Sequence, residues 1–407
     1  MSRDDSKDDA QGGFTRGSQE FTRMLVAMFA AGVATFAQLY SPQGILPSIA
    51  SSLSIDAASA ALMISSSTLG LAVFALVWAY IADLWGKSRA MFVAVSLATL
   101  LGLVIPWVPS LSVILLLRFV QGAALAGLAS IAVAFIAEET NPLYVPTATG
   151  LYVAGTTLGG LMGRLIAGPV SQLTGDWRLA LTTVSVLGAG ASLTFMLLLP
   201  RARRFTPLPR QGSLTVLISR IGTHLRNPGM LALFLLAFTL MGTFVSVYNY
   251  VGFKLEAPPY LFSEIAISLL FVAYLLGTVS SSVSGPLVQR WGRLTVLALG
   301  AALMVVGILL TMCAPLALVI TGILLLTFGF FCSHSVAASW VGARASTGKA
   351  QATALYNVAY YLGSAAVGWV SGLFYNAGGW QLTGLFVISL LVLFGTASGL
   401  VLRGRRA

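Results

Sequence analysis

Two arginines stand inside long apolar segments of the chain. Arg118 lies in an apolar run over residues 110–138, and Arg164 lies in a second run over 146–173. Helical rise places Arg118 about 12 Å and Arg164 about 13 Å from the expected outer ends of their runs. An ionised side chain at membrane depth is costly, so each arginine is a candidate functional residue. A guanidinium group suits the oxygens of a substrate, and either arginine could bind one there.

No acid is expected at the depth of the two arginines. The twelve aspartates and glutamates fall in the N-terminal tail or at the ends of the apolar runs, although a shift of one turn would bring Asp56 or Asp176 within reach. A buried cationic substrate would need such an acid as its partner. A neutral or anionic substrate is therefore the better hypothesis. The alternative is that both arginines bind backbone carbonyl groups freed by glycine-rich segments.

Other polar side chains complete the candidate substrate and coupling site. Gln38 is expected at the same depth as the arginines. His334, in the run over 316–341, could carry a proton because histidine titrates near neutral pH. The remaining candidates for lining a cavity are Tyr152, Tyr248, Asn249, Asn357, Tyr360 and Tyr361. For all of these residues, ordinary helix packing is the alternative interpretation.

The elements that must position these residues are membrane helices. Mean hydropathy is +0.90, and only 9% of the residues are charged. A helix needs about 20 apolar residues to cross a bilayer, and a helix satisfies its own backbone there. The apolar runs predict twelve spans, over roughly 22–47, 58–82, 89–108, 110–138, 146–173, 179–200, 228–253, 261–287, 294–313, 316–341, 350–375 and 381–402.

Positive charge is unevenly distributed between the predicted loops. Of the 23 lysines and arginines, only Arg178 and Lys254 are expected outside and only Arg118 and Arg164 within spans. Because cationic loops stay in the cytoplasm, both termini are expected there. The net charge of +11 is thus explained by topology and contact with anionic lipid, and nucleic acid is not an expected partner.

The chain divides into two related halves. We expect a disordered tail over 1–21, a six-helix bundle over 22–200, a cytoplasmic linker over 201–227, a second bundle over 228–402 and a short tail over 403–407. The halves repeat at an offset near 205: Gly159 corresponds to Gly363, and Gly168 corresponds to Gly372. Such a parallel repeat places a substrate path between the two bundles. Arg164 corresponds to Gly368, so this arginine belongs to one half only.

The loop after the second span contains Asp83, Gly86, Lys87 and Arg89, and the second half repeats it with Arg290, Gly292 and Arg293. These segments resemble the signature of the major facilitator superfamily between helices 2 and 3. Neither copy is complete, because Leu84 and Gln289 replace signature residues. Gly86 permits a tight turn, and the basic residues anchor the next helix at the headgroups. By this resemblance Asp83 would bind the N-terminus of the eleventh helix in one transport state. A solvated basic turn is the alternative.

Two further motifs carry the same resemblance. The fourth run contains Arg118-Phe-Val-Gln121-Gly122 and ends in Glu138-Glu139, and the resemblance implies that one of these acids pairs with the basic loop. The fifth run carries Gly155, Gly159, Gly160 and Gly163, which resemble the antiporter motif of drug-efflux members. Their spacing allows another helix to approach closely. The likeness covers the whole chain and is nearest to the YnfM-type, arabinose-efflux-permease-like branch.

The resemblance implies an all-α membrane protein with the major facilitator fold: twelve transmembrane helices in two pseudo-symmetric six-helix bundles. The expected function is proton-coupled export of small neutral or weakly anionic compounds, such as a sugar or an amphiphilic drug. An importer or organic-anion exchanger is the alternative, and a scaffold or receptor is a more remote one. We expect no cofactor beyond the proton gradient, no metal site and no catalytic residues, because no nucleophile set or ligand cluster is present. The protein is expected to be a monomer in the bacterial inner membrane.

Overall fold

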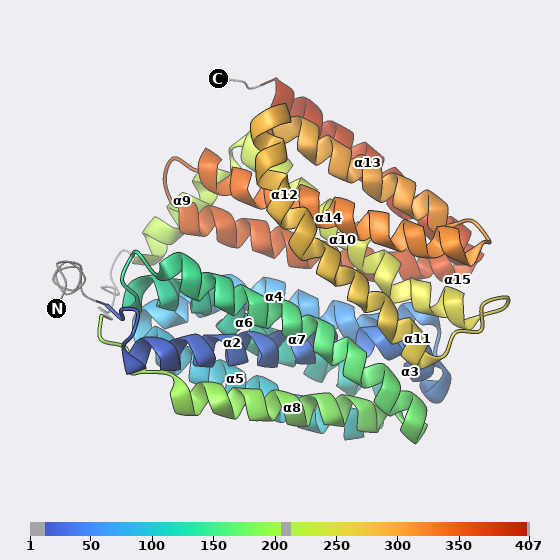
Figure 1. Ribbon diagram of the computed structural model, residues 1–407, viewed down its shortest axis with the longest axis horizontal. Coiled ribbons are helices and arrows are strands. Elements are labelled where there is room, and N and C mark those ends of the chain that lie inside the picture. The colour runs from blue at the N-terminus through green and yellow to red at the C-terminus, as the bar shows by residue number, and fades with distance from the viewer. Residues whose placement is uncertain (1–12, 205–212, 405–407) are drawn as a thin grey trace.

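Nearly every described residue belongs to a helix (Figure 1). The computed structural model describes residues 13–204 and 213–404. The helices run side by side, and the described ends of the chain lie at the same end of the molecule (Figure 1). This end also bears the loops between spans 2 and 3 (at Gly86), spans 8 and 9 (at Gly292) and spans 10 and 11 (residues 345–348). We call it the basic rim, and we call the other end the distal rim.

The first half contains six spans. The first span is broken into α2 (Gln19–Tyr40), the 3₁₀ segment η1 (Ser41–Ile45) and α3 (Leu46–Leu53). The others are α4 (Ala57–Trp85), α5 (Lys87–Val104) with η2 (Ile105–Trp107), α6 (Leu111–Glu139), α7 (Val145–Thr174) and α8 (Trp177–Leu198).

The second half repeats this order after the linker helix α9 (Ser213–Leu225). Its spans are α10 (Pro228–Glu256), then α11 (Glu264–Leu269) with η3 (Leu270–Tyr274) and α12 (Leu275–Trp291), then α13 (Arg293–Thr311), α14 (Leu316–Arg344) and α15 (Lys349–Arg403). The last of these comprises two spans, since the backbone of Gly378 and Gly379 is not helical.

The predicted fold class is confirmed. Among the described residues, 10 helices are long and apolar enough to cross a membrane. That set counts α15 once and omits α7, which is rich in glycine and threonine and carries Arg164. With α15 divided and α7 included, the helices match the twelve predicted spans.

The glycines of α7 pack against the first span. A side chain on Gly155, Gly159 or Gly163 would strike the backbone of Phe29, Val33 or Ala37, respectively. The two helices therefore meet through backbone atoms, as small residues permit.

The second half repeats this packing. Gly363 of α15 lies against Phe238 of α10 as Gly159 lies against Val33, and both pairs follow the offset near 205.

The two bundles touch near the distal rim through matched contacts. Gly168 of α7 lies against Glu264 and Ser268 of α11, and Gly372 of α15 lies against Ala58 of α4. Toward the basic rim the ribbons of the two bundles spread apart (Figure 1).

The expectation of a disordered tail over 1–21 is wrong for residues 13–21, and residues 1–12 lie outside the described part. Phe14 is buried, and its backbone pairs with Glu139 and Asn141. Ser18 then caps α2 by accepting a hydrogen bond from the N–H of Phe21 at 3.1 Å. Burial of one aromatic ring and a helix cap order this segment, neither of which a polar composition reveals.

Replacing Gly159 by alanine should destabilise the protein. The new Cβ would lie 2.5 Å from the carbonyl oxygen of Val33, so α2 and α7 would have to separate. Such overpacking costs about 1–3 kcal/mol. We expect the melting temperature of the purified protein to fall by a few degrees. Gly190→Ala is the matched control, because nothing lies within 4 Å of a Cβ there; equal melting temperatures for the two variants would contradict the packing role.

Candidate functional site

Arg164 of α7 lies at the interface between the bundles. Its Nε and Nη2 atoms both donate to Oε1 of Gln43, at 2.8 and 2.6 Å. Its Nη1 atom donates to the carbonyl oxygen of Gly160, one turn earlier, at 2.6 Å. The side chain is only 3% exposed. The main partner of this buried cation is thus a neutral amide.

Aromatic rings from both bundles surround the guanidinium group of Arg164. Its Cζ atom lies 4.5 Å from the ring centre of Tyr40, 4.7 Å from that of Tyr274 and 4.9 Å from that of Phe271. Tyr40 ends α2, whereas Phe271 and Tyr274 belong to η3 of the second bundle. Such rings stabilise a desolvated cation through their π faces. We call Tyr40, Phe271 and Tyr274 the aromatic box.

A chain of hydrogen bonds links Arg164 to the second bundle. Gln43 of η1 accepts from Arg164 and donates through Nε2 to Oδ1 of Asn249 on α10, at 2.7 Å. The Nδ2 atom of Asn249 and the hydroxyl group of Ser65 are buried without a hydrogen-bond partner among the described residues. Both atoms lie beside Gly368, the repeat counterpart of Arg164. Unsatisfied polar atoms at this depth are costly, so the site can accept a further polar group.

Within the part of the chain that the structure describes, no acid neutralises Arg164. None of the ion pairs between described residues involves it. Asp56 and Asp176, the two acids left open by the sequence, instead cap helices at the distal rim, where they accept from the backbone of Ser59 and Arg178 at 2.7 and 2.8 Å. The hydrogen bond from Ser59 lowers the pKa of the Asp56 carboxyl group.

Arg118 has a different environment, entirely within the first bundle. Its guanidinium group donates to the carbonyl oxygens of Met63, Gln38 and Leu39 at 2.9, 3.1 and 2.7 Å. Pro42 has no N–H group to offer the carbonyl of Gln38, four residues earlier. Arg118 therefore satisfies carbonyl groups exposed by the break in the first span. The geometry favours the second interpretation of Arg118, in which it binds free backbone carbonyl groups rather than substrate. These carbonyl groups are freed by the break at Pro42 and not by glycine-rich segments.

Gln38 belongs to the same internal network. Its Oε1 atom accepts from Gln121 at 3.2 Å, and Gln121 accepts from Arg118 at 2.7 Å. Gln38 is 2% exposed. It lies in the polar core of the first bundle, apart from the bonds that join Arg164 to Asn249.

His334 lies in an aromatic cluster on the second bundle. The hydroxyl group of Tyr356 lies 3.0 Å from its Nδ1 atom. Its ring stacks on Phe330 and lies 4.9 Å from the ring of Tyr360, which contacts Tyr361 edge-on. This cluster and the aromatic box are joined through Phe330, which stacks on Phe244 beside Tyr274.

The remaining candidates for lining a cavity are dispersed. Tyr152 is buried, and its backbone carbonyl group lies against Gly32 of α2. Tyr248 is buried, and its hydroxyl group is 2.7 Å from that of Thr327. Asn357 is exposed on the half of α15 nearer the basic rim.

The 2–3 loop forms an ion-pair network with the end of α6. Lys87 lies 2.7 Å from Glu138 and 3.7 Å from Asp83. Gly86 has a φ of +96°, which only glycine adopts readily, and Arg89 is exposed. The N-terminus of α15, the predicted partner of Asp83, is instead next to α9, where His224 lies 3.2 Å from the carbonyl oxygen of Gly348.

The matching loop of the second bundle has the same turn without the acids. Gly292 has a φ of +80°. Arg290 lies over the ring of Trp291, and Arg293 lies over that of Trp340, at 5.8 and 6.0 Å.

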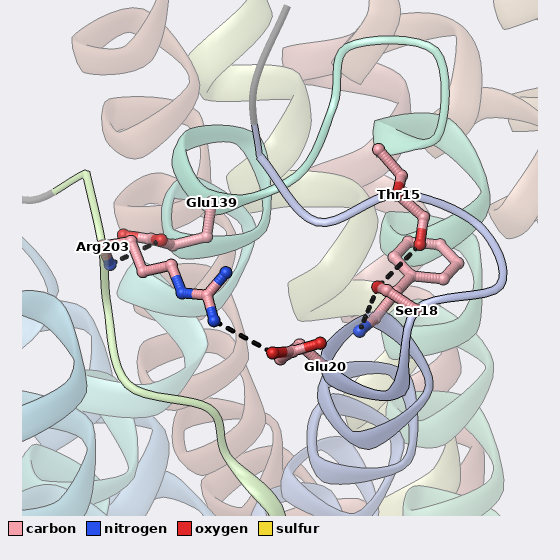
Figure 2. Close-up of polar contacts among 6 residues, drawn as sticks. Thr15, Ser18, Glu20, Glu139 and Arg203 are labelled. Atoms are coloured by element: carbon pink, nitrogen blue, oxygen red, sulfur yellow. Dashed lines mark hydrogen bonds and ion pairs between the residues drawn. The ribbon is translucent and has the colours of Figure 1, made fainter. Parts of the chain in front are cut away.

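Glu139 holds the start of the linker to the first bundle (Figure 2). Its carboxylate accepts from the backbone N–H groups of Arg203 and Arg204, at 2.8 and 3.0 Å. The side chain of Arg203 also pairs with Glu20 of α2 at 2.9 Å. Glu138 and Glu139 are thus divided between two tasks: one binds the 2–3 loop and the other binds the linker.

The sequence profile of the Major Facilitator Superfamily matches residues 27–261 and 252–407. The chain belongs to this superfamily. The resemblance inferred from its motifs is confirmed, and the chain is a multi-pass membrane transporter of the YnfM type.

Relatives of this superfamily member cover almost its full length. It is 38% identical to the MFS-type transporter YybF of Bacillus subtilis, over 93% of each chain. It is 36% identical to the inner membrane transport protein YnfM of Escherichia coli, over 93% of this chain and 90% of that protein. Both are named as transporters, so this chain is a transporter and not an enzyme.

Solved structures of the superfamily share the fold at low identity. A mutant of the nucleoside transporter NupG matches with a TM-score of 0.78 at 16% identity, over 93% of this chain and 99% of that one. The xylose transporter XylE from E. coli, in a partially occluded inward open conformation, matches with a TM-score of 0.69 at 15% identity, over 96% and 98%.

Within this superfamily fold, the partners of Arg164 were not predicted. Gln43 and Tyr40 flank the break at Pro42, and Phe271 and Tyr274 lie in the 3₁₀ segment η3. A proline inside an apolar run was the available signal for the first pair. No comparable signal marks η3, which contains neither proline nor glycine.

Glu139→Gln should loosen the linker. The amide retains one acceptor oxygen but loses the charge, and a hydrogen bond to a charged group is worth about 1.5–3 kcal/mol. Cleavage by trypsin at Arg203 and Arg204 should therefore accelerate about tenfold or more, measured by mass spectrometry of the fragments. Glu138→Gln, whose partner is Lys87, is the control and should cleave like the unaltered protein. Equal acceleration in both variants would refute the assignment.

Proposed function

We propose that this transporter exports small neutral or weakly anionic organic molecules in exchange for protons, and that Arg164 binds the substrate. The observation that carries the proposal is a buried guanidinium group between the bundles with an amide as its main acceptor. Alternating access requires a site that both bundles share. Arg164, Tyr40 and Gln43 come from one bundle, and Asn249 and Tyr274 from the other.

A weakly anionic substrate fits Arg164 better than a neutral one. A carboxylate offers this arginine two charged oxygens, whereas Gln43 offers one neutral oxygen. Such a substrate would displace Gln43 from Arg164. Because Gln43 also binds Asn249, this exchange would weaken a contact that joins the bundles near the distal rim.

The surroundings of Arg164 favour a substrate with an apolar or aromatic body. The aromatic box covers the guanidinium group, and Tyr248 and Phe244 extend it on the second bundle. Rings of this kind pack against amphiphilic compounds and against the faces of sugars. The unpaired Nδ2 atom of Asn249 would donate to an oxygen of the same molecule.

Proton coupling would fall to His334 or to the substrate itself. The imidazole of His334 lies 3.0 Å from the hydroxyl group of Tyr356 and is the ionisable group nearest to this role, and a substrate that is a weak acid can also carry a proton. Import and organic-anion exchange use the same site and remain the alternative. We propose a monomer in the bacterial inner membrane. The basic loops favour placing both termini in the cytoplasm, in contact with anionic lipid.

The decisive measurement is recovery of internal pH in inside-out vesicles. A proton gradient is imposed, and sugars, neutral drugs, cationic drugs and organic acids are added in turn. We expect a response to an organic acid or a neutral amphiphile and none to cations. In Arg164→Gln the KM should rise about 10- to 100-fold, as expected for loss of a charge-assisted contact.

Arg118→Gln is the comparator for this measurement. It removes the other buried arginine, and with it the donors to the carbonyl groups of Gln38 and Leu39 in the first span. We expect lower folded yield with an unaltered KM in the folded fraction. Normal transport by Arg164→Gln would overturn the assignment of the site. A response to cations alone would overturn the substrate class.

The network of Asp83, Lys87 and Glu138 is proposed as part of the gate at the basic rim. Asp83→Asn should slow transport severalfold and leave substrate affinity nearly unchanged. Asp83 lies at the end of α4 at the basic rim, whereas Arg164 lies in the half of α7 nearer the distal rim. Initial flux and equilibrium binding are compared in the same preparation. Arg403→Gln, a charge change at the same rim on the last helix, is the control. Parallel losses of binding and flux in Asp83→Asn would contradict the gating role.

A further inference from the structure

The basic rim of the second bundle has lost the acids of the first. α6 and α14 are related by 205 residues at both ends, so Glu138 and Glu139 correspond to Ala343 and Arg344. Gln289 similarly stands in place of Asp83. Among the described residues, no acid is paired with Arg290 or Arg293. The turn is the same in both bundles, but in the second its cations remain available to a partner.

An apolar groove begins beside these two arginines. It has a volume of about 280 Å³ and lies between α12, α13 and α14. Trp291, over which Arg290 lies, forms part of its wall, and Val296 stands one turn after Arg293. Leu299, Val306 and Phe328 continue the wall toward the middle of the membrane. Trp291, Leu299 and Val306 are 45–47% exposed, so the groove opens on the outer surface of the bundle.

The length of the groove matches the thickness of the hydrocarbon layer of one membrane leaflet. From Val296 to Val306 on α13, the helical rise gives about 15 Å. The hydrocarbon core of a bilayer is about 30 Å thick, so one leaflet contributes half of that. One acyl chain entering beside Arg290 and Arg293 would therefore fill the groove without leaving its leaflet.

We propose that this surface binds one anionic phospholipid, whose phosphate group lies against Arg290 and Arg293 and whose acyl chain occupies the groove beside Trp291. Charge complementarity selects the headgroup, because two arginines without acids meet a phosphate. The rings of Trp291 and Trp340, which lie beside Arg290 and Arg293, are of the type that concentrates at the boundary between membrane and water. The first bundle lacks this site, because Lys87, which corresponds to Arg293, already forms ion pairs with Glu138 and Asp83.

Lipid retention by the full-length protein tests the proposal. Protein reconstituted with phosphatidylglycerol or phosphatidylcholine is released into mild detergent, and bound lipid is counted by native mass spectrometry. We expect one retained phosphatidylglycerol and little phosphatidylcholine. Each arginine near a membrane surface contributes about a fivefold gain in affinity, so Arg290→Gln with Arg293→Gln should weaken binding about 30-fold. Arg403→Gln, at the same rim on a residue that does not line the groove, should retain the lipid.

A second variant tests the groove itself. Ala302 is exposed and lines the groove, so Ala302→Phe fills it from the lipid side without entering the core. It should release the phosphatidylglycerol, whereas Ala397→Phe, on an exposed face of α15, should not. Equal retention by the double arginine variant and Arg403→Gln would overturn the proposal. So would equal retention of the two lipids, or unaltered binding in Ala302→Phe.

Discussion

The break at Pro42 in the first span is the constraint on which the polar interior depends. Inside a bilayer every backbone carbonyl group needs an internal partner, and Pro42 has no N–H group for Gln38. Arg118 supplies donors to Gln38 and Leu39, which fixes α6 against the broken span. The same break turns Gln43 toward the second bundle, where it meets Arg164 and Asn249. Arg118 thus stabilises the break, and Arg164 binds Gln43, which lies directly after it.

The fold could be predicted because hydropathy, positive charge and glycine spacing can each be read within one segment of the chain. They indicate the helices, their orientation and their close-packed faces without knowledge of distant contacts. The glycines of α7 and their counterparts in α15 meet their partners as their spacing indicates. The position of Arg164 inside a long helix was predictable in the same way. The partners of Arg164 were not predictable, since the aromatic box joins Tyr40 at the end of α2 to Phe271 and Tyr274 of η3, which belongs to the other bundle. The pairing of the Phe14 backbone with that of Glu139 was not predicted either. Burial of the single Phe14 ring orders this segment, although its overall composition is polar.

The two bundles share a backbone plan and differ in where they place charge. Arg164 of the first corresponds to Gly368 of the second, so one side of the interface carries a cation and the other leaves space beside Asn249 and Ser65. At the basic rim the relation is reversed. There the first bundle neutralises Lys87 with Glu138, whereas Arg290 and Arg293 face tryptophan rings. A duplicated scaffold can therefore acquire a polar site between its halves and a charged surface on one of them without altering its helix packing.

The bridge from Arg164 through Gln43 to Asn249 also constrains how a substrate could drive the conformational cycle. A ligand shifts an equilibrium between two states only by its difference in affinity for them. A neutral molecule that leaves Gln43 on Arg164 leaves the bridge near the distal rim intact, so it gains nothing from opening that rim. An anion that takes Arg164 frees the Oε1 atom of Gln43 and so weakens the link from Gln43 to Asn249. On the proposed function, the negative charge of the substrate is therefore what connects occupancy of the site to separation of the bundles, and a weak acid suits this mechanism better than a sugar.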